Sequence, residues 1–486
     1  MRIESDSLGT KAVDDAAYYG IHTERARDNF PVTSRPVDGR LVRNLILVKE
    51  ACANANAETG RLAADKHRMI VGACEAILDD FDRFASELRT PAIQGGAGTS
   101  TNMNANEVIA NLAAEMAGAK KGTYELIHPN DDVNMAQSTN DVYPTAGHMA
   151  LVEYATDLLD QLEKTASSFL KLAHEHRFSL KMGRTQLEDA VPTTFGKEFH
   201  AYYRVLMRDY KRIEAASASL LEVPLGGTAI GTSICATQEY CDAVVPELRR
   251  LSGMPLTQAE DLSDAVQNTD CYVALSSAYK NLATDLIKIT NDLRLLGSGP
   301  QAGLHELELP KVQAGSSIMP GKVNPVIPEV CAQAAFQVVG NDAAIALASS
   351  SGQLELNAFE PVMFDDLFED ASLLRGALLT LKKNCLDHLK VNEQRCAEMA
   401  AHSAGLATAL SPTIGYRAAA KIAQEAVATG ESIEVLLKEK INIPDSKIKE
   451  LLNPQNLLQP ANSSVKLETA KIGRASKLET ATMLKR

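Results

Sequence analysis

The central part of the chain carries long segments with helical periodicity, and this feature limits the fold most strongly. In residues 147–176 the apolar side chains form one stripe of a helix with 3.6 residues per turn, made of Leu151, Leu158, Leu159, Leu162, Phe169 and Leu170. Similar patterns cover residues 197–222, 266–296, 328–350 and 363–390. Each segment exceeds the usual length of a globular helix. Long helices that follow one another in sequence predict an elongated bundle and an all-α fold.

The 486 residues fit two or three domains. The polar stretch "STNDVYPT" leads into the first long helix, and prolines return after about residue 391. We therefore expect three domains: an N-terminal domain at 1–142, a central helical bundle at 143–394 and a small helical domain at 395–486. Residues 1–50 mix glycine, proline and short apolar runs, which is compatible with a small hairpin. The basic residues and the repeated "KLETA" of 463–486 predict a weakly amphipathic helix or a disordered tail.

The composition excludes several classes of function. A formal net charge of −13 argues against general binding to nucleic acid or to membranes. An anionic substrate would therefore need a local positive site. The eight cysteines show no C-x-x-C motif and no zinc spacing, so free thiols in a reducing compartment are expected. Glu4 and Asp6 stand where a signal peptide would be apolar, and no run of about 18 apolar residues exists. We expect a cytoplasmic protein.

One irregular stretch is too long for an ordinary connection between bundle helices. Residues 297–327 contain "GSSIMPGKVNP", in which two serines, a lysine and an asparagine lie among glycines and prolines. Most helix connections in bundles take two to eight residues, and longer ones are usually functional or disordered. The apolar Ile318, Met319 and Val323 argue against disorder. This stretch is predicted to be a lid that carries catalytic groups, with 313–327 as the catalytic loop.

Three further stretches are rich in hydroxyl and amide groups. They are "GGAGTSTNMNANE" (95–107), "HPNDDVNMAQSTND" (128–141) and "GRTQLEDAVP" (183–192). Each alone could serve as a helix cap or a turn. Four such stretches, far apart in sequence, indicate a shared polar site.

These residues resemble the fumarase/aspartase superfamily. "GSSIMPGKVNP" is similar to its signature loop, and the other three stretches match its remaining active-site segments in the same order. The resemblance runs from residue 17 to about residue 460. It implies a three-domain helical fold and a homotetramer whose active sites are shared between subunits. Some members respond to divalent cations, but the sequence shows no cluster of metal ligands, so no cofactor is expected.

Within the superfamily, the chain resembles the members that convert L-aspartate to fumarate and ammonium. Thr139, Gln186 and Glu360 stand where fumarases usually carry Ser, His and Lys, whereas Gly321 is shared with fumarases. The implied reaction removes a Cβ proton and passes through a doubly negative aci-carboxylate. Prepositioned donors must stabilise that intermediate. Two alternatives stay open: a fumarate hydratase, and a catalytically silent helical scaffold of the same superfamily.

The resemblance makes Ser316 the general base, acting as an alkoxide held by backbone N–H groups and a nearby cation. Lys322 would supply the local positive charge. The expected substrate-binding residues are Thr99, Ser138, Thr139, Asn140, Thr185, Gln186, Lys322 and Asn324. Two supporting residues each have a second interpretation. His128 could assist the leaving amine or only position a turn, and Glu329 could join the active-site network or only place charge at a helix N-terminus.

No other catalytic motif competes. The Ala-Ser-Gly tripeptide of electrophile-forming ammonia-lyases does not occur in the sequence. "LGGTAIG" (225–231) lacks the ending of a phosphate-binding loop, and we interpret it as a turn between helices. The expected partners are therefore a small dicarboxylate, ammonium and further copies of this chain, with no nucleic acid and no membrane.

Overall fold

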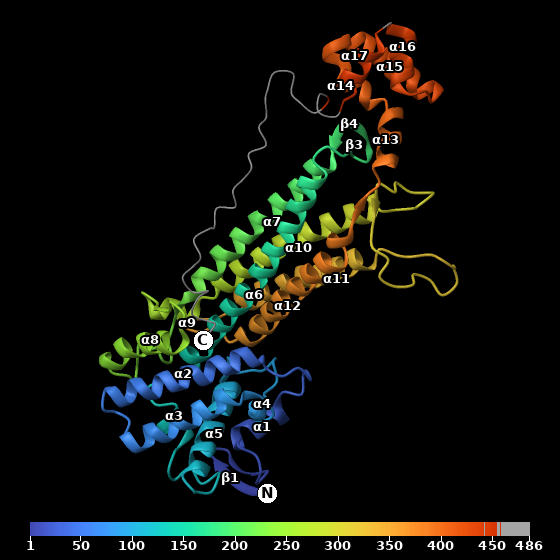
Figure 1. The fold of residues 1–486 in the computed structure, drawn as a ribbon. Helices are drawn as coiled ribbons and strands as arrows, with labels where there is room; N and C mark the ends of the chain where they lie inside the picture. Colours follow the sequence, from blue (N-terminus) through green and yellow to red (C-terminus); the bar gives the residue numbers. More distant parts are fainter. Residues whose placement is uncertain (442, 454–456, 458–486) are drawn as a thin grey trace.

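The computed structural model describes residues 1–441, 443–453 and 457, so the tail at 463–486 lies outside the described residues. The chain forms an elongated molecule with a helical N-terminal region at one end, a long bundle in the middle and small helices at the other end (Figure 1). Strands occur only as two-stranded pairs among the described residues. The all-α fold with a long central bundle is confirmed.

Five long helices make the bundle: α6 (Thr139–Glu175), α7 (Phe195–Ala218), α10 (Asp270–Leu296), α11 (Val326–Ser350) and α12 (Glu360–Asn384). Helix α6 packs against α7 and α12, and α11 packs between α10 and α12. The apolar stripe of α6 faces inward, because Leu151, Leu158, Leu162 and Phe169 are fully buried. At 37 residues, α6 is about 55 Å long, since each helical residue adds about 1.5 Å.

The N-terminal region packs against the near end of the bundle. It contains a hairpin of β1 (Arg2–Asp6) and β2 (Gly9–Val13), which confirms the small β element expected there. Its helices are α1 (Ile21–Asn29), α2 (Gly39–Glu58), α3 (Ala64–Asp79), α4 (Phe81–Phe84) and α5 (Thr99–Met116). Helix α2 contacts α6 and also α8 (Gln238–Ser252). The parallel pair β5 (Glu222–Val223) and β6 (Thr257–Gln258) and helix α9 (Leu262–Gln267) lie in the α7–α10 connection.

The far end of the bundle carries two further strand pairs. Strands β3 (Leu180–Thr185) and β4 (Glu188–Thr194) form a hairpin between α6 and α7. Strand β7 (Leu307–Glu308) pairs with β8 (Lys390–Val391) at the base of the long 297–325 connection. A separate apolar cluster then holds the terminal helices together. The helices of this cluster are α14 (Gly405–Ile414), α15 (Tyr416–Thr429), α16 (Ile433–Ile441) and α17 (Asp445–Leu451), and α13 (Glu393–His402) precedes them.

Helix α11 is apolar on more than its buried side. Val330, Phe336 and Leu347 are 48%, 56% and 68% exposed. Of the helices that the structure describes, α11 alone has the length and apolar composition of a membrane span. It also packs along α10 and α12. A single chain therefore leaves an uncovered apolar face on one of its bundle helices.

Candidate active site

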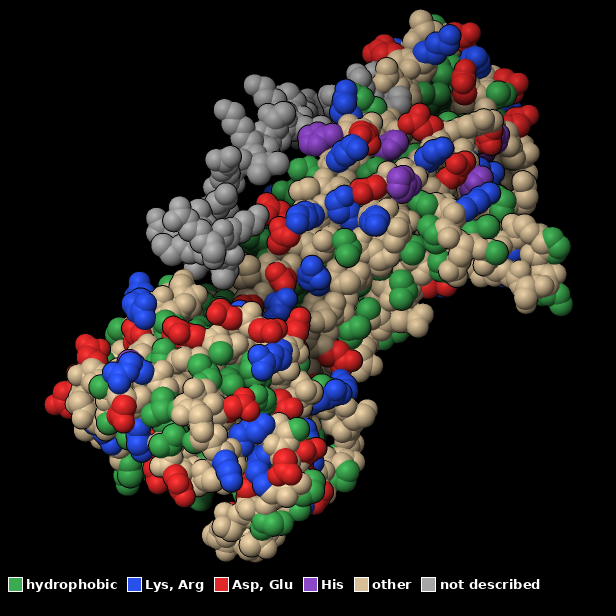
Figure 2. Space-filling model, turned by 60° about the horizontal axis from the view of Figure 1, so that its bottom comes forward, with side chains coloured by type: hydrophobic (Ala, Val, Ile, Leu, Met, Phe, Trp, Pro, Cys, Tyr) green, Lys and Arg blue, Asp and Glu red, His purple; other side chains and the backbone are tan. Residues whose placement is uncertain are grey.

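Ser316 lies in a tight loop whose backbone points toward its side chain. The Ser316 Oγ atom accepts hydrogen bonds from the backbone N–H groups of Ile318 at 3.2 Å and Met319 at 2.9 Å. Two converging donors favour negative charge on that oxygen. The loop projects from the body of the molecule with hydrophobic side chains at its tip (Figure 2), where Ile318 is 83% exposed.

The neck of the loop is closed by one backbone hydrogen bond and one hydrogen bond from a side-chain amide. The Gly315 N–H donates to the Lys322 carbonyl at 3.0 Å, and the Asn324 amide donates to the Gly315 carbonyl at 2.8 Å. A Cβ atom on Gly315 would lie 2.5 Å from the Lys322 oxygen, so only glycine fits. Gly321 adopts a φ of +79°, which also favours glycine. Asn324 thus holds the loop closed, and Lys322 is exposed on it.

Thr99 and Thr139 begin two adjacent helices, α5 and α6. Thr99 follows Gly98, whose φ is +86°, and its hydroxyl donates to the Gly96 carbonyl at 2.6 Å. The Thr139 hydroxyl oxygen accepts from the Asn102 amide at 3.1 Å, so α5 and α6 are joined at their N-terminal ends. Helix N-termini attract anions because their first N–H groups are unpaired.

Asp141 fixes the segment that contains Ser138, Thr139 and Asn140. Its Oδ1 atom accepts from the Ser138 N–H at 2.9 Å. Its Oδ2 atom accepts from the N–H groups of Gly226 at 3.1 Å and Thr228 at 3.0 Å. Burial raises the pKa of this carboxyl to about 6, even though the backbone hydrogen bonds lower it.

The 225–231 segment, expected to be only a turn between helices, therefore braces the candidate site. Besides its two bonds to Asp141, it binds Asn140, whose amide donates to the Ala229 carbonyl at 2.8 Å. Thr228 is buried with a φ of +55°, and its hydroxyl oxygen has no partner among the described residues. The glycines of "LGGTAIG" indicate such close approach, but the sequence alone did not relate them to residues 138–141.

Thr185 and Gln186 lie at the tip of the β3–β4 hairpin. Thr185 pairs with Glu188, so Gln186 and Leu187 form a two-residue turn with positive φ at both positions. The hairpin is anchored by Arg184, whose guanidinium makes two bonds, of 2.5 and 3.2 Å, to the fully buried Glu306. Because Glu306 begins the approach to the Ser316 loop, the hairpin and the root of the loop are tied together.

His128 and Glu329 have structural partners. The His128 Nδ1 atom accepts from the Asp131 N–H at 3.1 Å and caps the short helical turn η1 (Pro129–Val133). Glu329 lies in the first turn of α11, 3.7 Å from the Arg294 guanidinium. These contacts agree with the positioning interpretation of His128 and the helix-terminus interpretation of Glu329, and the catalytic roles of both stay predictions.

The single chain gathers these residues in two places. Thr99, Ser138, Thr139 and Asn140 lie at the N-terminal end of α6, whereas Thr185 and Gln186 follow its C-terminal end (Figure 1). The length of α6, about 55 Å, separates the two places. The loop with Ser316, Lys322 and Asn324 is rooted on the side of the hairpin. A small dicarboxylate cannot touch both groups within one chain.

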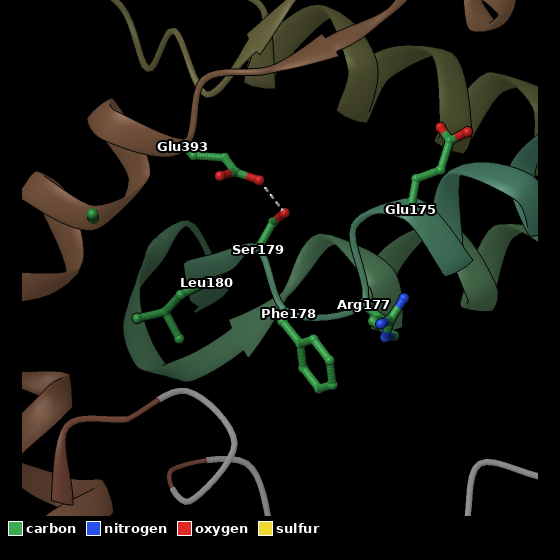
Figure 3. Close-up of a pocket in the computed structure, with 7 residues that line it drawn as sticks. Glu175, Arg177, Phe178, Ser179, Leu180 and Glu393 are labelled. Carbon is green, nitrogen blue, oxygen red and sulfur yellow. Dashed lines mark hydrogen bonds between the residues drawn. The ribbon is translucent and has the colours of Figure 1, made fainter. Parts of the chain in front are cut away.

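A hollow near the far end of the bundle contains none of these residues. It is lined by Glu175, Arg177, Phe178, Ser179, Leu180, Glu393 and Ala397. The Ser179 hydroxyl donates to Glu393 across it at 2.5 Å (Figure 3). Among the residues that the structure describes, no group of three or more His, Cys, Asp or Glu side chains is arranged to hold a metal ion.

The chain matches two family models. One, described as lyase, covers residues 9–340, and one, described as fumarase C C-terminus, covers residues 406–459. An aspartate ammonia-lyase from a Bacillus species is 46% identical over 95% of this chain and 98% of its own length. An aspartate ammonia-lyase from Escherichia coli K12 is 41% identical over 95% of this chain and 97% of its own.

Solved structures of lyases and fumarases also resemble this chain along nearly its whole length. A fumarate lyase:delta crystallin from Brucella melitensis, bound to cobalt, superposes with a TM-score of 0.91 at 44% identity and covers 94% of this chain and all of that chain. A class II fumarase from Schistosoma mansoni superposes with a TM-score of 0.89 at 32% identity, over 95% of this chain and all of that one. The family match and the relatives, together with the long bundle and the serine loop, show that the chain is a lyase. The chain belongs to the fumarase/aspartase superfamily.

Proposed function

We propose that the chain catalyses the reversible deamination of L-aspartate to fumarate and ammonium. Relatives with 41 to 47% identity over nearly the whole chain are aspartate ammonia-lyases, which supports this substrate. The observation that carries the chemistry is the Ser316 oxygen, which accepts two backbone N–H groups and could therefore hold negative charge.

In this reaction the Ser316 alkoxide takes a Cβ proton from aspartate. The electron pair left on Cβ spreads into the adjacent carboxylate and forms the aci-carboxylate. The C–N bond then breaks, its electrons leave with the nitrogen, and the C–C double bond of fumarate forms. The nitrogen leaves as ammonia and, with the proton that Ser316 removed, becomes ammonium, so atoms and charge balance.

The substrate carboxylates would be bound by the two groups of residues described above. Thr99, Ser138, Thr139 and Asn140 would contribute hydroxyls, an amide and two helix N-termini. Thr185, Gln186, Lys322 and Asn324 would come from the hairpin and the loop, with Lys322 as the positive charge. His128 and Glu329 remain supporting residues in this proposal: the His128 Nδ1 atom caps η1, and Glu329 lies 3.7 Å from the Arg294 guanidinium.

This arrangement requires more than one chain. The separation along α6 and the exposed apolar face of α11 support a homotetramer in which the bundles pack together and complete shared sites. All eight cysteines are free and most are buried, which fits a reducing cytoplasmic location.

The test is an assay in both directions. Purified protein should form fumarate from L-aspartate, followed by ultraviolet absorbance, and should form aspartate from fumarate plus ammonium. Formation of malate alone from fumarate would identify a hydratase and contradict the proposal. No turnover with either substrate pair would favour the silent scaffold.

A further inference from the structure

Lys49 is a fully buried cation beneath the candidate site. It lies on α2 with none of its surface exposed. Its Nζ atom donates to Asn134 Oδ1 at 2.9 Å and to Gln137 Oε1 at 2.8 Å. Both acceptors are neutral amides. A buried ammonium without a carboxylate partner is costly to keep, so such a group calls for a role beyond packing.

The Lys49 ammonium is connected to Thr139 by hydrogen bonds. Asn134 Oδ1 accepts from Lys49 and also from the Asn102 amide at 3.2 Å. The same Asn102 amide donates to the Thr139 hydroxyl oxygen at 3.1 Å. Because Thr139 acts as the acceptor in this contact, its own proton is available to a second partner. These hydrogen bonds leave the Thr139 hydroxyl able to donate to a ligand, and they connect it to the positive charge of Lys49.

We propose that Lys49 is a positioning residue for the substrate: through Asn134 and Asn102 it orients the Thr139 hydroxyl and adds a second positive charge to the dicarboxylate site. The proposal rests on the proposed function, because it assumes that Thr139 faces a dianion. It also explains how a chain with net charge −13 holds an anion at the α5 and α6 termini, where the exposed Lys322 is not in contact in the single chain.

The charge on Lys49 can be changed by changing the pH. Burial lowers the pKa of Lys49 to about 8. The titratable groups that face it come from its own helix, α3, α6 and α8: Cys52, Cys74, Asp141 and Tyr240. The pKa of Cys52 is raised to about 12 and that of Asp141 to about 6. Burial also raises the pKa of Cys74 and that of Tyr240 well above their ordinary values. None of these neighbours titrates between pH 7 and 9.5.

Affinity for a dicarboxylate and the contribution of Lys49 to folding stability should change in opposite directions as the pH rises above 8. Between pH 8 and 10.5 the unfolded chain keeps a proton on Lys49 that the folded chain has released, so the contribution of Lys49 to folding stability rises with pH. Affinity for a dicarboxylate should fall over the same range, because the ammonium is lost. A role confined to packing would not produce this opposition.

The experiment measures succinate binding by calorimetry from pH 7 to 9.5. Wild-type affinity should fall roughly tenfold, the size expected for a hydrogen bond assisted by charge. Lys49→Met removes the charge and the hydrogen bonds, whereas Lys49→Gln keeps an amide donor. Both should bind about tenfold more weakly at pH 7 and show no decline with pH. Lys164→Met, which removes an exposed cation of α6 paired with Asp160, is the matched control and should keep the wild-type profile.

Wild-type affinity at pH 7 in Lys49→Gln, or a wild-type profile that does not change with pH, would overturn the proposal. If both Lys49 variants fail to fold, Asn102→Ala leaves the lysine and its two acceptors in place, and it should weaken succinate binding at pH 7 as well. An Asn102→Ala variant with unchanged affinity would overturn the proposal. Absence of aspartate turnover in the wild type would instead overturn the proposed function, which is a separate result.

Discussion

Ser138 and Asp141 cap each other at the first turn of α6. The Ser138 N–H donates to the Asp141 carboxylate at 2.9 Å, and the Ser138 hydroxyl oxygen accepts from the helix backbone, at 3.3 Å from the Asn140 nitrogen. The same carboxylate binds two N–H groups of the 225–231 segment. One buried side chain therefore sets the start of the helix, the position of its polar residues and the loop that covers them.

Replacing Asp141 should lower stability and disturb the site together. In Asp141→Asn the amide can accept through one oxygen only, so the N–H of Ser138 or the two N–H groups of 226–228 lose their partner. We expect a loss of roughly 2–4 kcal/mol in the free energy of unfolding, measured in urea. Asp157→Asn, which changes a partly exposed carboxyl on the same helix, should cost under about 1 kcal/mol. Equal losses in both variants would contradict this account.

Removal of the Ser316 hydroxyl should stop turnover without loss of binding. Ser316→Ala is expected to reduce kcat by about 10²–10⁴, the range typical for loss of a general base. Affinity for succinate should change little, because Lys322 and the threonines remain. Ser317→Ala is the matched control: it removes the neighbouring hydroxyl, which is exposed, and should keep most of the activity. A Ser316→Ala enzyme that keeps the wild-type rate would show that another group is the base.

A charge on the exposed face of α11 should disrupt assembly. Phe336 is 56% exposed in the single chain, and a carboxylate there could not be buried between bundles. We expect Phe336→Glu to shift the protein from the proposed tetramer to smaller species in sedimentation velocity and to lose activity at the same time. Val427→Glu, at a 76% exposed position of α15, should leave both unchanged. A fully tetrameric Phe336→Glu protein would place the interface elsewhere.

Glu360 should make stability depend on pH. Burial raises its pKa from 4.5 to about 8, and the Tyr272 hydroxyl donates to it at 3.4 Å. A carboxyl with a raised pKa contributes stability that is complete below pH 4.5 and is lost as the pH rises to about 8. The Glu360→Gln variant has no carboxyl to titrate at this position, so it should not show this loss of stability. Thermal unfolding at pH 5, 7 and 9 should show the variant gaining on the wild type as pH rises, whereas a constant difference would mean that Glu360 does not titrate in this range.

The long helices could be predicted because large apolar residues repeat along one side of each. The start of α6 was harder to place. Periodicity begins near residue 147, whereas the helix begins at Thr139, because its first turns consist of small and polar residues held by a cap and include Pro144. The domain limits at 142/143 and 394/395 remain predictions, although the separate apolar cluster of α14–α17 supports a distinct C-terminal unit.

The chemistry of the candidate site could be inferred from residue types, but its layout could not. The four polar stretches and the helix at 147–176 are visible in the sequence, whereas the start of α6 at Thr139 and the position of the Ser316 loop beside the β3–β4 hairpin become evident only in the fold. Lys49 was missed because a lysine usually indicates a solvent-exposed position. A signal did exist: Leu45, Lys49 and Cys52 follow the i, i+4, i+7 spacing of a buried helix face.

The length of α6 also bears on when activity would appear during synthesis. With the shared sites proposed above, a chain that has just folded alone would carry the components of a reaction centre about 55 Å apart and would be inert toward a small acid. Turnover would begin only after newly made chains met one another. The lag before activity would shorten steeply as chain concentration rises, so that gene dosage would set the timing of catalysis as well as its amount.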